Sequence, residues 1–207
     1  MVETPECAGN RAGETPADDV SIETPLVVAI LIGSSRKGRI GRSVADWFVG
    51  QTMERNLKVD LIDLAELVLP LDLQPDARVR ELSERIGAAD AVVMVTPEYN
   101  HGYPATLKLA IDCLREEWAA KPVSFVSYGG LSGGLRAVEQ LRQVCAELHM
   151  VSLRDVVSFH QVHARFDASG RLTRPEPSIA AAARLLDSLD WWGRALREAR
   201  SRRPYPS

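Results

Sequence analysis

Five continuous apolar runs, each followed by a segment with helical periodicity, constrain the fold of this chain more than any other feature. We predict strands at 26–32, 57–64, 90–96, 122–128 and 151–159. We predict helices at 41–55, 76–87, 104–114, 134–149 and 176–200. Because the strands are apolar throughout, both of their faces should be buried, which is typical of a parallel sheet covered by helices on both sides. The pattern predicts a doubly wound α/β domain with a five-stranded parallel sheet in the flavodoxin-like order 2-1-3-4-5.

The residues before the first strand differ in composition from the rest of the chain. Residues 1–24 contain six acidic residues and one Arg, and the triplet Glu-Thr-Pro begins at Glu3, Glu14 and Glu23. They offer too little apolar surface to offset the entropy of ordering, so we expect a disordered acidic tail there. We place the folded domain at 25–200 and a basic tail at 201–207. The basic residues from Arg194 onward are not interleaved with aromatic residues and lie at the end of an amphipathic helix, so we expect a solvated helix end rather than a nucleic-acid surface. With no secretory signal and no apolar run of ~20 residues, we expect a cytoplasmic protein without membrane or nucleic-acid partners.

The first strand is followed by GSSRKGRIG, residues 33–41, which combines glycine, hydroxyl and cationic groups. Its cations are Arg36, Lys37 and Arg39. The loop opens a helix, and the N–H groups of a helix N-terminus favour an anion, so we predict that it binds a phosphate. The Walker pattern fails because Arg39 and Ile40 stand where it requires Lys and Ser or Thr, and the GxGxxG fingerprint is absent. A nucleotide hydrolase or a dinucleotide fold of that kind is therefore not expected.

Two further loops follow the third and fourth strands, TPEYNHGYP at 96–104 and SYGGLSGG at 127–134. The first mixes flat or rigid apolar side chains with polar groups, which suits a planar heterocycle with polar edges. The second offers main-chain amides beside an aromatic side chain. In the order 2-1-3-4-5 the strands before all three loops are neighbours, so the loops should line one crevice at the switch point of the sheet. The ends of the second and fifth strands carry no comparable signal.

As a set, these loops resemble the signature loops of the NADPH-dependent FMN reductase family, which has a flavodoxin-like fold. The matching segments are GSSRKGRIG, TPEYNHGYPATLKLAID and SYGGLSGGLRA, in the same order as in that family. The resemblance implies FMN as cofactor, NADPH or NADH as co-substrate, and a flavin, quinone, azo or similar small molecule as electron acceptor. It also implies a homodimer or homotetramer and a monooxygenase as a partner for the reduced flavin. Leu109 stands where the family often has Asn.

The resemblance assigns residues of this chain to parts of FMN. The phosphate would be held by Ser34, Arg36, Arg39, Ile40 and Gly41. The isoalloxazine ring would lie along Pro97, Glu98, Tyr99 and Asn100, and its other edge would be flanked by Ser127, Tyr128, Gly129 and Gly130. No catalytic acid, base or nucleophile is assigned, because the flavin carries the hydride chemistry, and no metal is assigned.

Two other functions are open to the same sequence. Gly130 to Gly134 matches GxSxG between a strand and a helix, so Ser132 is a possible hydrolase nucleophile, with Asp155 or Asp167 and His160 or His163 following in the order of that fold. The basic first loop would then have no role. A flavodoxin-type electron carrier would share the fold and FMN, but such carriers dock through acidic surfaces. Here the net negative charge lies in the tail, and the remaining residues carry a net charge of about +2.

Overall fold

The strands form one sheet in the order β2-β1-β3-β4-β5, and each neighbouring pair is parallel, as the alternating pattern predicts. The computed structural model describes residues 24–206. The strands are β1 (Leu26–Ile32), β2 (Leu57–Asp63), β3 (Ala91–Pro97), β4 (Pro122–Tyr128) and β5 (Val151–Phe159). The helices are α1 (Gly41–Gly50), α2 (Ala77–Ala88), α3 (Ala105–Asp112), α4 (Leu135–Glu147) and α5 (Glu176–Arg202), with short 3-10 turns η1 (Glu116–Trp118) and η2 (Val162–Ala164). The predicted fold class is confirmed.

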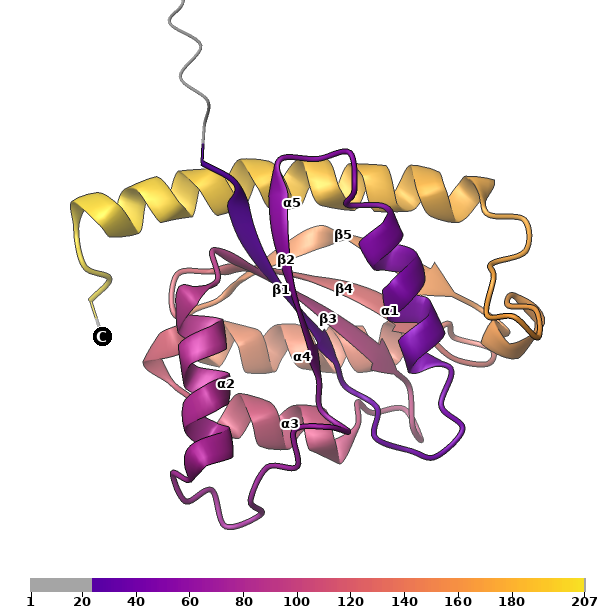
Figure 1. Ribbon diagram of the computed structural model, residues 1–207, viewed down its shortest axis with the longest axis horizontal. Coiled ribbons are helices and arrows are strands. Elements are labelled where there is room, and N and C mark those ends of the chain that lie inside the picture. The colour runs from indigo at the N-terminus through magenta and orange to yellow at the C-terminus, as the bar shows by residue number, and fades with distance from the viewer. Residues whose placement is uncertain (1–23, 207) are drawn as a thin grey trace, which may run out of the picture.

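Two apolar layers, one on each face of the sheet, explain why the strands are apolar along their whole length. Side chains of β1 alternate between the layers: Ile30 and Ile32 pack with α1 and α5, whereas Leu31 packs with α2, α3 and α4. All three side chains are fully buried. Figure 1 shows α5 as the long yellow helix that runs along the long axis of the domain. The sheet is therefore covered on both faces, which leaves its ends as the places for a site.

The observed helix ends differ from the predicted ones by up to five residues. The first helix ends at Gly50 rather than residue 55, because Thr52 turns the chain and its hydroxyl donates to the Val49 carbonyl at 2.7 Å. Asp76, predicted as a helical residue, is the N-cap of α2 and accepts hydrogen bonds from two main-chain N–H groups. In contrast, α5 continues to Arg202, into the segment predicted as a basic tail.

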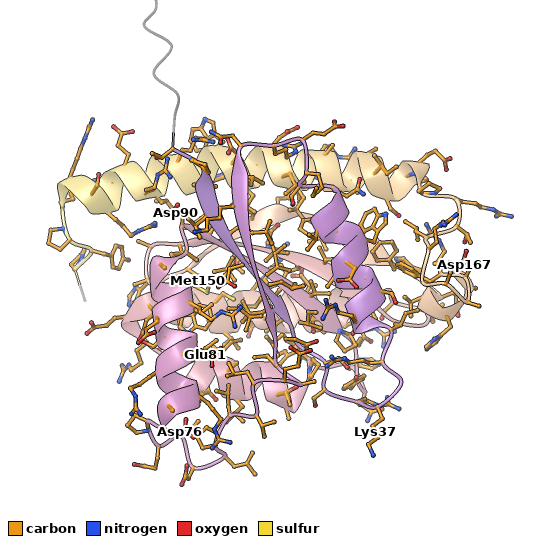
Figure 2. All side chains as sticks on the ribbon, viewed as in Figure 1. Lys37, Asp76, Glu81, Asp90, Met150 and Asp167 are labelled. Carbon is orange, nitrogen blue, oxygen red and sulfur yellow. The ribbon has the colours of Figure 1, made fainter. Side chains whose placement is uncertain are left out.

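The predicted acidic tail lies outside the described residues except for Thr24. Within residues 24–206 no helix combines the length and the apolar character that crossing a bilayer requires. Figure 2 labels Lys37 in the loop after β1 and Asp90 just before β3. Lys37 marks the edge of the sheet at which the strands end, and Asp90 marks the edge at which they begin. The loops singled out in the sequence all lie at the Lys37 edge, where β1, β3 and β4 end.

Candidate functional site

The loop after β1 is tied to β3 and α3 at its first residue. The Gly33 N–H donates to the Val95 carbonyl at 2.9 Å, and the Thr106 hydroxyl donates to the Gly33 carbonyl at 2.6 Å. A Cβ at Gly33 would lie 3.2 Å from Leu107, closer than ordinary contact. Glycine therefore lets α3 pack against the start of this loop, which fixes where the following cationic residues lie.

Arg39 folds the loop back on itself through a buried ion pair. Its guanidinium donates to the Ser34 carbonyl at 2.6 Å and to the Asp63 carboxylate at 2.5 Å. Asp63 ends β2, and its side chain is only 3% exposed. The carboxylate also accepts from the Ala65 N–H at 3.0 Å. Sequence reasoning did not select Asp63, although an acid at the end of a strand beside the switch point is a signal that could have found it.

Arg36 and Lys37, in contrast, are exposed. The Arg36 guanidinium lies over the ring of Tyr99, 5.2 Å from its centroid, in a cation–π contact. The hydroxyls of Ser34 and Tyr99 are hydrogen-bonded at 2.6 Å. The loop after β1 and the loop after β3 therefore contact each other, as expected for loops that follow neighbouring strands.

The loop after β3 holds two consecutive residues in the left-handed backbone region. Asn100 and His101 have φ values of 50° and 70°. The turn is closed by Tyr99 and Gly102, which exchange two main-chain hydrogen bonds of 2.9 and 3.0 Å. The Gln140 amide donates to the His101 carbonyl at 3.1 Å from α4. Asn and His are among the non-glycine residues that adopt this region most readily, and the hydrogen bond from α4 supports a fixed shape at the turn.

The loop after β4 is shaped by close packing of its backbone. Gly134 has a φ of 86°, and a Cβ there would lie 2.8 Å from Tyr128 N, so a side chain is excluded on both grounds. The Ser127 hydroxyl donates to the Gly133 carbonyl at 2.8 Å. Ser127 is fully buried, and its hydrogen bond to Gly133 holds the loop in place.

The end of β5 supplies a further wall that the sequence did not predict. Gln161 N–H donates to the Gly130 carbonyl at 2.8 Å, and Val162 N–H donates to the Gly129 carbonyl at 3.0 Å. These bonds lay η2 against the third loop and bring Val162 and His163 to the site. The end of the fifth strand carries no comparable signal in the sequence, because main-chain pairing leaves no mark on the residue types.

Together the loops enclose a cavity of about 230 Å³. It is lined by Ser34, Arg36, Lys37, Gly38, Arg39, Ile40, Pro97, Glu98, Tyr99, Tyr128, Gly129, Gly130, Val162 and His163. Three predicted site residues do not line it. Ser127 lies beneath the loop, Gly41 is buried at the start of α1, and Asn100 is exposed at the turn. Lys37, Gly38, Val162 and His163 line it without having been selected.

Two features of the cavity suit an anion. Ile40, the N-cap residue of α1, lines the cavity, and in the part of the chain that the structure describes this helix N-terminus has no side-chain capping hydrogen bond. Tyr128, predicted at the ring edge, buries its side chain so that its hydroxyl lies against the first residue of α1. Within residues 24–206 that hydroxyl oxygen is buried and has no hydrogen-bond partner. An uncapped helix start, a free hydroxyl and exposed cations fit a phosphate group.

Glu98 joins the second and third loops. The Ser132 hydroxyl donates to its carboxylate at 2.5 Å, and Arg136 Nε lies 3.4 Å from its other oxygen. His160 instead places Nδ1 at 2.8 Å from the Leu131 carbonyl. In the described part of the chain, the hydrogen bonds of the Ser132 hydroxyl go to Glu98 and to the Gly134 N–H, not to a histidine. This is not the nucleophile–base contact that a serine hydrolase requires.

Comparison with known proteins gives consistent results. A model of the family described as NADPH-dependent FMN reductase matches residues 26–164. The NAD(P)H-dependent FMN reductase LOT6 of Saccharomyces cerevisiae is 38% identical over 147 residues, which cover 60% of this chain and 76% of that protein. A quinone reductase of Escherichia coli is 38% identical over 131 residues, covering 58% and 69% of the two chains. The solved structure of FerB, a flavoenzyme NAD(P)H:(acceptor) oxidoreductase from Paracoccus denitrificans, superposes with a TM-score of 0.66 at 26% identity, covering 82% of this chain and 98% of that one.

Proposed function

This chain belongs to the NADPH-dependent FMN reductase family, and from that premise we propose that it is an NAD(P)H-dependent, FMN-containing oxidoreductase whose acceptor is a flavin, quinone, azo compound or similar small molecule. One observation carries the assignment to this site. A loop rich in cations and hydroxyls and a loop rich in aromatic and polar groups line the same cavity at the switch point of the sheet. FMN is a ligand with an anionic group at one end and a planar heterocycle at the other.

The phosphate end of FMN would lie at the first loop. Arg36 and Lys37 supply exposed positive charge, and the uncapped start of α1 supplies main-chain N–H groups from Ile40 and Gly41. The Ser34 hydroxyl adds a polar group that is already held by Tyr99. Arg39 has other N–H donors besides the two used by Ser34 and Asp63, so we propose that it both shapes the loop and faces the phosphate.

The ring end would lie between the second and third loops. Residues 97–100 offer one wall, and the backbone around Gly129 and Gly130 offers the other, with Ser127 supporting it. When bound, FMN supplies the hydride chemistry itself. The chain orients the ring and keeps one of its faces open for the nicotinamide and the acceptor. Main-chain N–H groups near Gly130 point at the polar edge of the flavin ring, where negative charge develops during reduction. Glu98, fixed by Ser132 and Arg136, holds the two walls at a constant separation.

Assembly and partners extend the proposal. Leu131 in the third loop and Leu135 at the start of α4 are 82% and 41% exposed, which supports a covered surface in a homodimer or homotetramer. We place the enzyme in the cytoplasm, with a monooxygenase as a user of reduced flavin. Light scattering of the purified chain tests the assembly, and a monomer would contradict it.

The decisive experiment is a visible absorption spectrum of the purified chain with added FMN, followed by anaerobic NADPH. We expect a protein-bound flavin band that bleaches on addition of the nicotinamide nucleotide, and ping-pong kinetics when an acceptor is supplied. Bound flavin that neither NADPH nor NADH reduces would identify an electron carrier. Absence of flavin binding would refute the site, and labelling by a fluorophosphonate that is lost in Ser132→Ala would then identify a hydrolase.

A further inference from the structure

We propose that the Tyr128 hydroxyl is a direct ligand of the FMN phosphate and that it helps this site distinguish FMN from riboflavin. The inference rests on the proposed function, and it assigns Tyr128 to the end of the cofactor opposite to the one that sequence resemblance implied. Riboflavin has the same ring and the same ribityl chain as FMN but no phosphate, so it is the natural probe for this assignment.

The first argument is the state of the hydroxyl itself. Tyr128 ends β4, is only 4% exposed and lines the cavity. Within residues 24–206 its oxygen has no hydrogen-bond partner. A buried polar atom without a partner destabilises a protein, and such atoms are rare unless a bound group satisfies them. The hydroxyl is therefore an unused donor on a residue that lines the cavity.

The second argument is what surrounds the hydroxyl. A Cβ at Gly41 would lie 2.4 Å from the Tyr128 oxygen, so the hydroxyl sits against the first residue of α1. The α1 N-terminus has no side-chain cap. Ser34, whose hydroxyl is bonded to Tyr99, lies near the Tyr128 hydroxyl at the start of the cationic loop. The free hydroxyl thus lies where an uncapped helix start and the cationic loop both favour an anion.

The third argument is the chemistry of the donor. Burial raises the pKa of Tyr128 well above its ordinary value, and the nearby Ser34 hydroxyl and Arg39 offset only part of the rise. The phenol therefore keeps its proton at neutral pH and can donate a hydrogen bond to a phosphate oxygen. Because the ring is fixed in the core, the donor loses little freedom on binding. Removing the hydroxyl should weaken the binding of FMN and leave the contacts of the flavin ring unchanged.

The test compares Tyr128→Phe with the unchanged chain in titrations of apo-protein by FMN and by riboflavin, followed by flavin fluorescence. We expect the dissociation constant of FMN to rise roughly tenfold or more and that of riboflavin to stay unchanged. Only FMN loses a hydrogen bond to a charged group in the variant. The ³¹P resonance of bound FMN should also shift in the variant. The apo form should melt at the same or a higher temperature, because the variant removes an unpartnered hydroxyl. Tyr205→Phe, an exposed tyrosine remote from the cavity, is the matched control.

Each other result has a definite meaning. Equal weakening of FMN and riboflavin, or no change in either, would overturn the assignment while leaving an FMN site in place. A Tyr128→Phe chain that fails to fold would show that the hydroxyl has a structural partner, and this would overturn it as well. An unchanged chain that binds neither flavin would refute the proposed function instead.

Discussion

Replacing Arg39 by Ala should destabilise the protein even in the absence of cofactor. Arg39 pairs with Asp63, and the two side chains are 17% and 3% exposed. Without the guanidinium the Asp63 carboxylate stays buried, and within residues 24–206 its remaining hydrogen bond comes from the Ala65 N–H. Breaking one partner of a buried pair costs about 3–5 kcal/mol, and for a chain of this size each kcal/mol lowers the melting temperature by roughly 2–4 °C. Taking the lower bound, we expect Arg39→Ala to melt roughly 6–12 °C below the unchanged chain.

Arg42→Ala is the matched control for this experiment. Arg42 lies in the first turn of α1, just after the loop that carries Arg39, and pairs with Asp46 at 2.8 Å, but those side chains are 49% and 54% exposed. An exposed pair of this kind is worth at most about 0.5–1 kcal/mol. The assay is thermal unfolding of the flavin-free chain followed by circular dichroism, at low and at high salt. High salt should leave the effect of Arg39→Ala nearly unchanged, because a buried pair is screened little.

The double variant Arg39→Ala, Asp63→Asn separates a lost charge pair from a lost shape. Removing the buried charge should recover part of the stability, since a neutral amide is less costly to bury than an unpaired carboxylate. If Arg39→Ala melts within the range of Arg42→Ala, the ion pair contributes nothing measurable and Arg39 is free to act on the phosphate alone.

Four further predictions follow from other parts of the structure. Arg36→Ala should weaken FMN roughly ten- to hundredfold in a fluorescence titration, and an unchanged affinity would remove Arg36 from the phosphate site. Gly41→Ala should destabilise the chain by about 1–3 kcal/mol, because the new Cβ would lie 2.4 Å from the Tyr128 hydroxyl; Tyr128→Phe should relieve most of this, and additive effects in unfolding experiments would contradict it. Burial lowers the pKa of Lys121 from 10.5 to about 8, so the folded chain binds its proton less tightly than the unfolded chain. Unfolding free energy measured in urea should therefore rise between pH 8 and 10.5, by up to about 3 kcal/mol relative to a Lys121→Met variant, and a flat difference would refute this. Burial raises the pKa of Cys145 to about 12, so mass spectrometry should find this thiol unalkylated in the native protein at neutral pH and alkylated in denaturant, and equal rates would contradict it.

The order of the elements and the edge that carries the site were accessible from the residues. Uninterrupted apolar strands such as Leu26–Ile32 require burial on both faces, and only a few topologies provide it. Strand order then brings the ends of β1, β3 and β4 together, so loops that are unusual in sequence had to meet. Helix ends were less accessible, because Asp76 and Thr52 act through hydrogen bonds to neighbouring backbone groups rather than through periodicity.

The partners within the site depended on the tertiary structure. Residue types identify Arg39 as a cation. Its partner Asp63 is 24 residues away in sequence, and the pairing depends on how β2 lies beside β1. His163 reaches the cavity because main-chain groups of η2 pair with Gly129 and Gly130, and such pairing is independent of side chains. The Tyr128 hydroxyl meets Gly41 because the end of β4 and the start of α1 pack in the same layer. Local patterns therefore determined which chemical groups the chain brings to this edge of the sheet, whereas long-range packing decided which of them are already paired and which are free to bind.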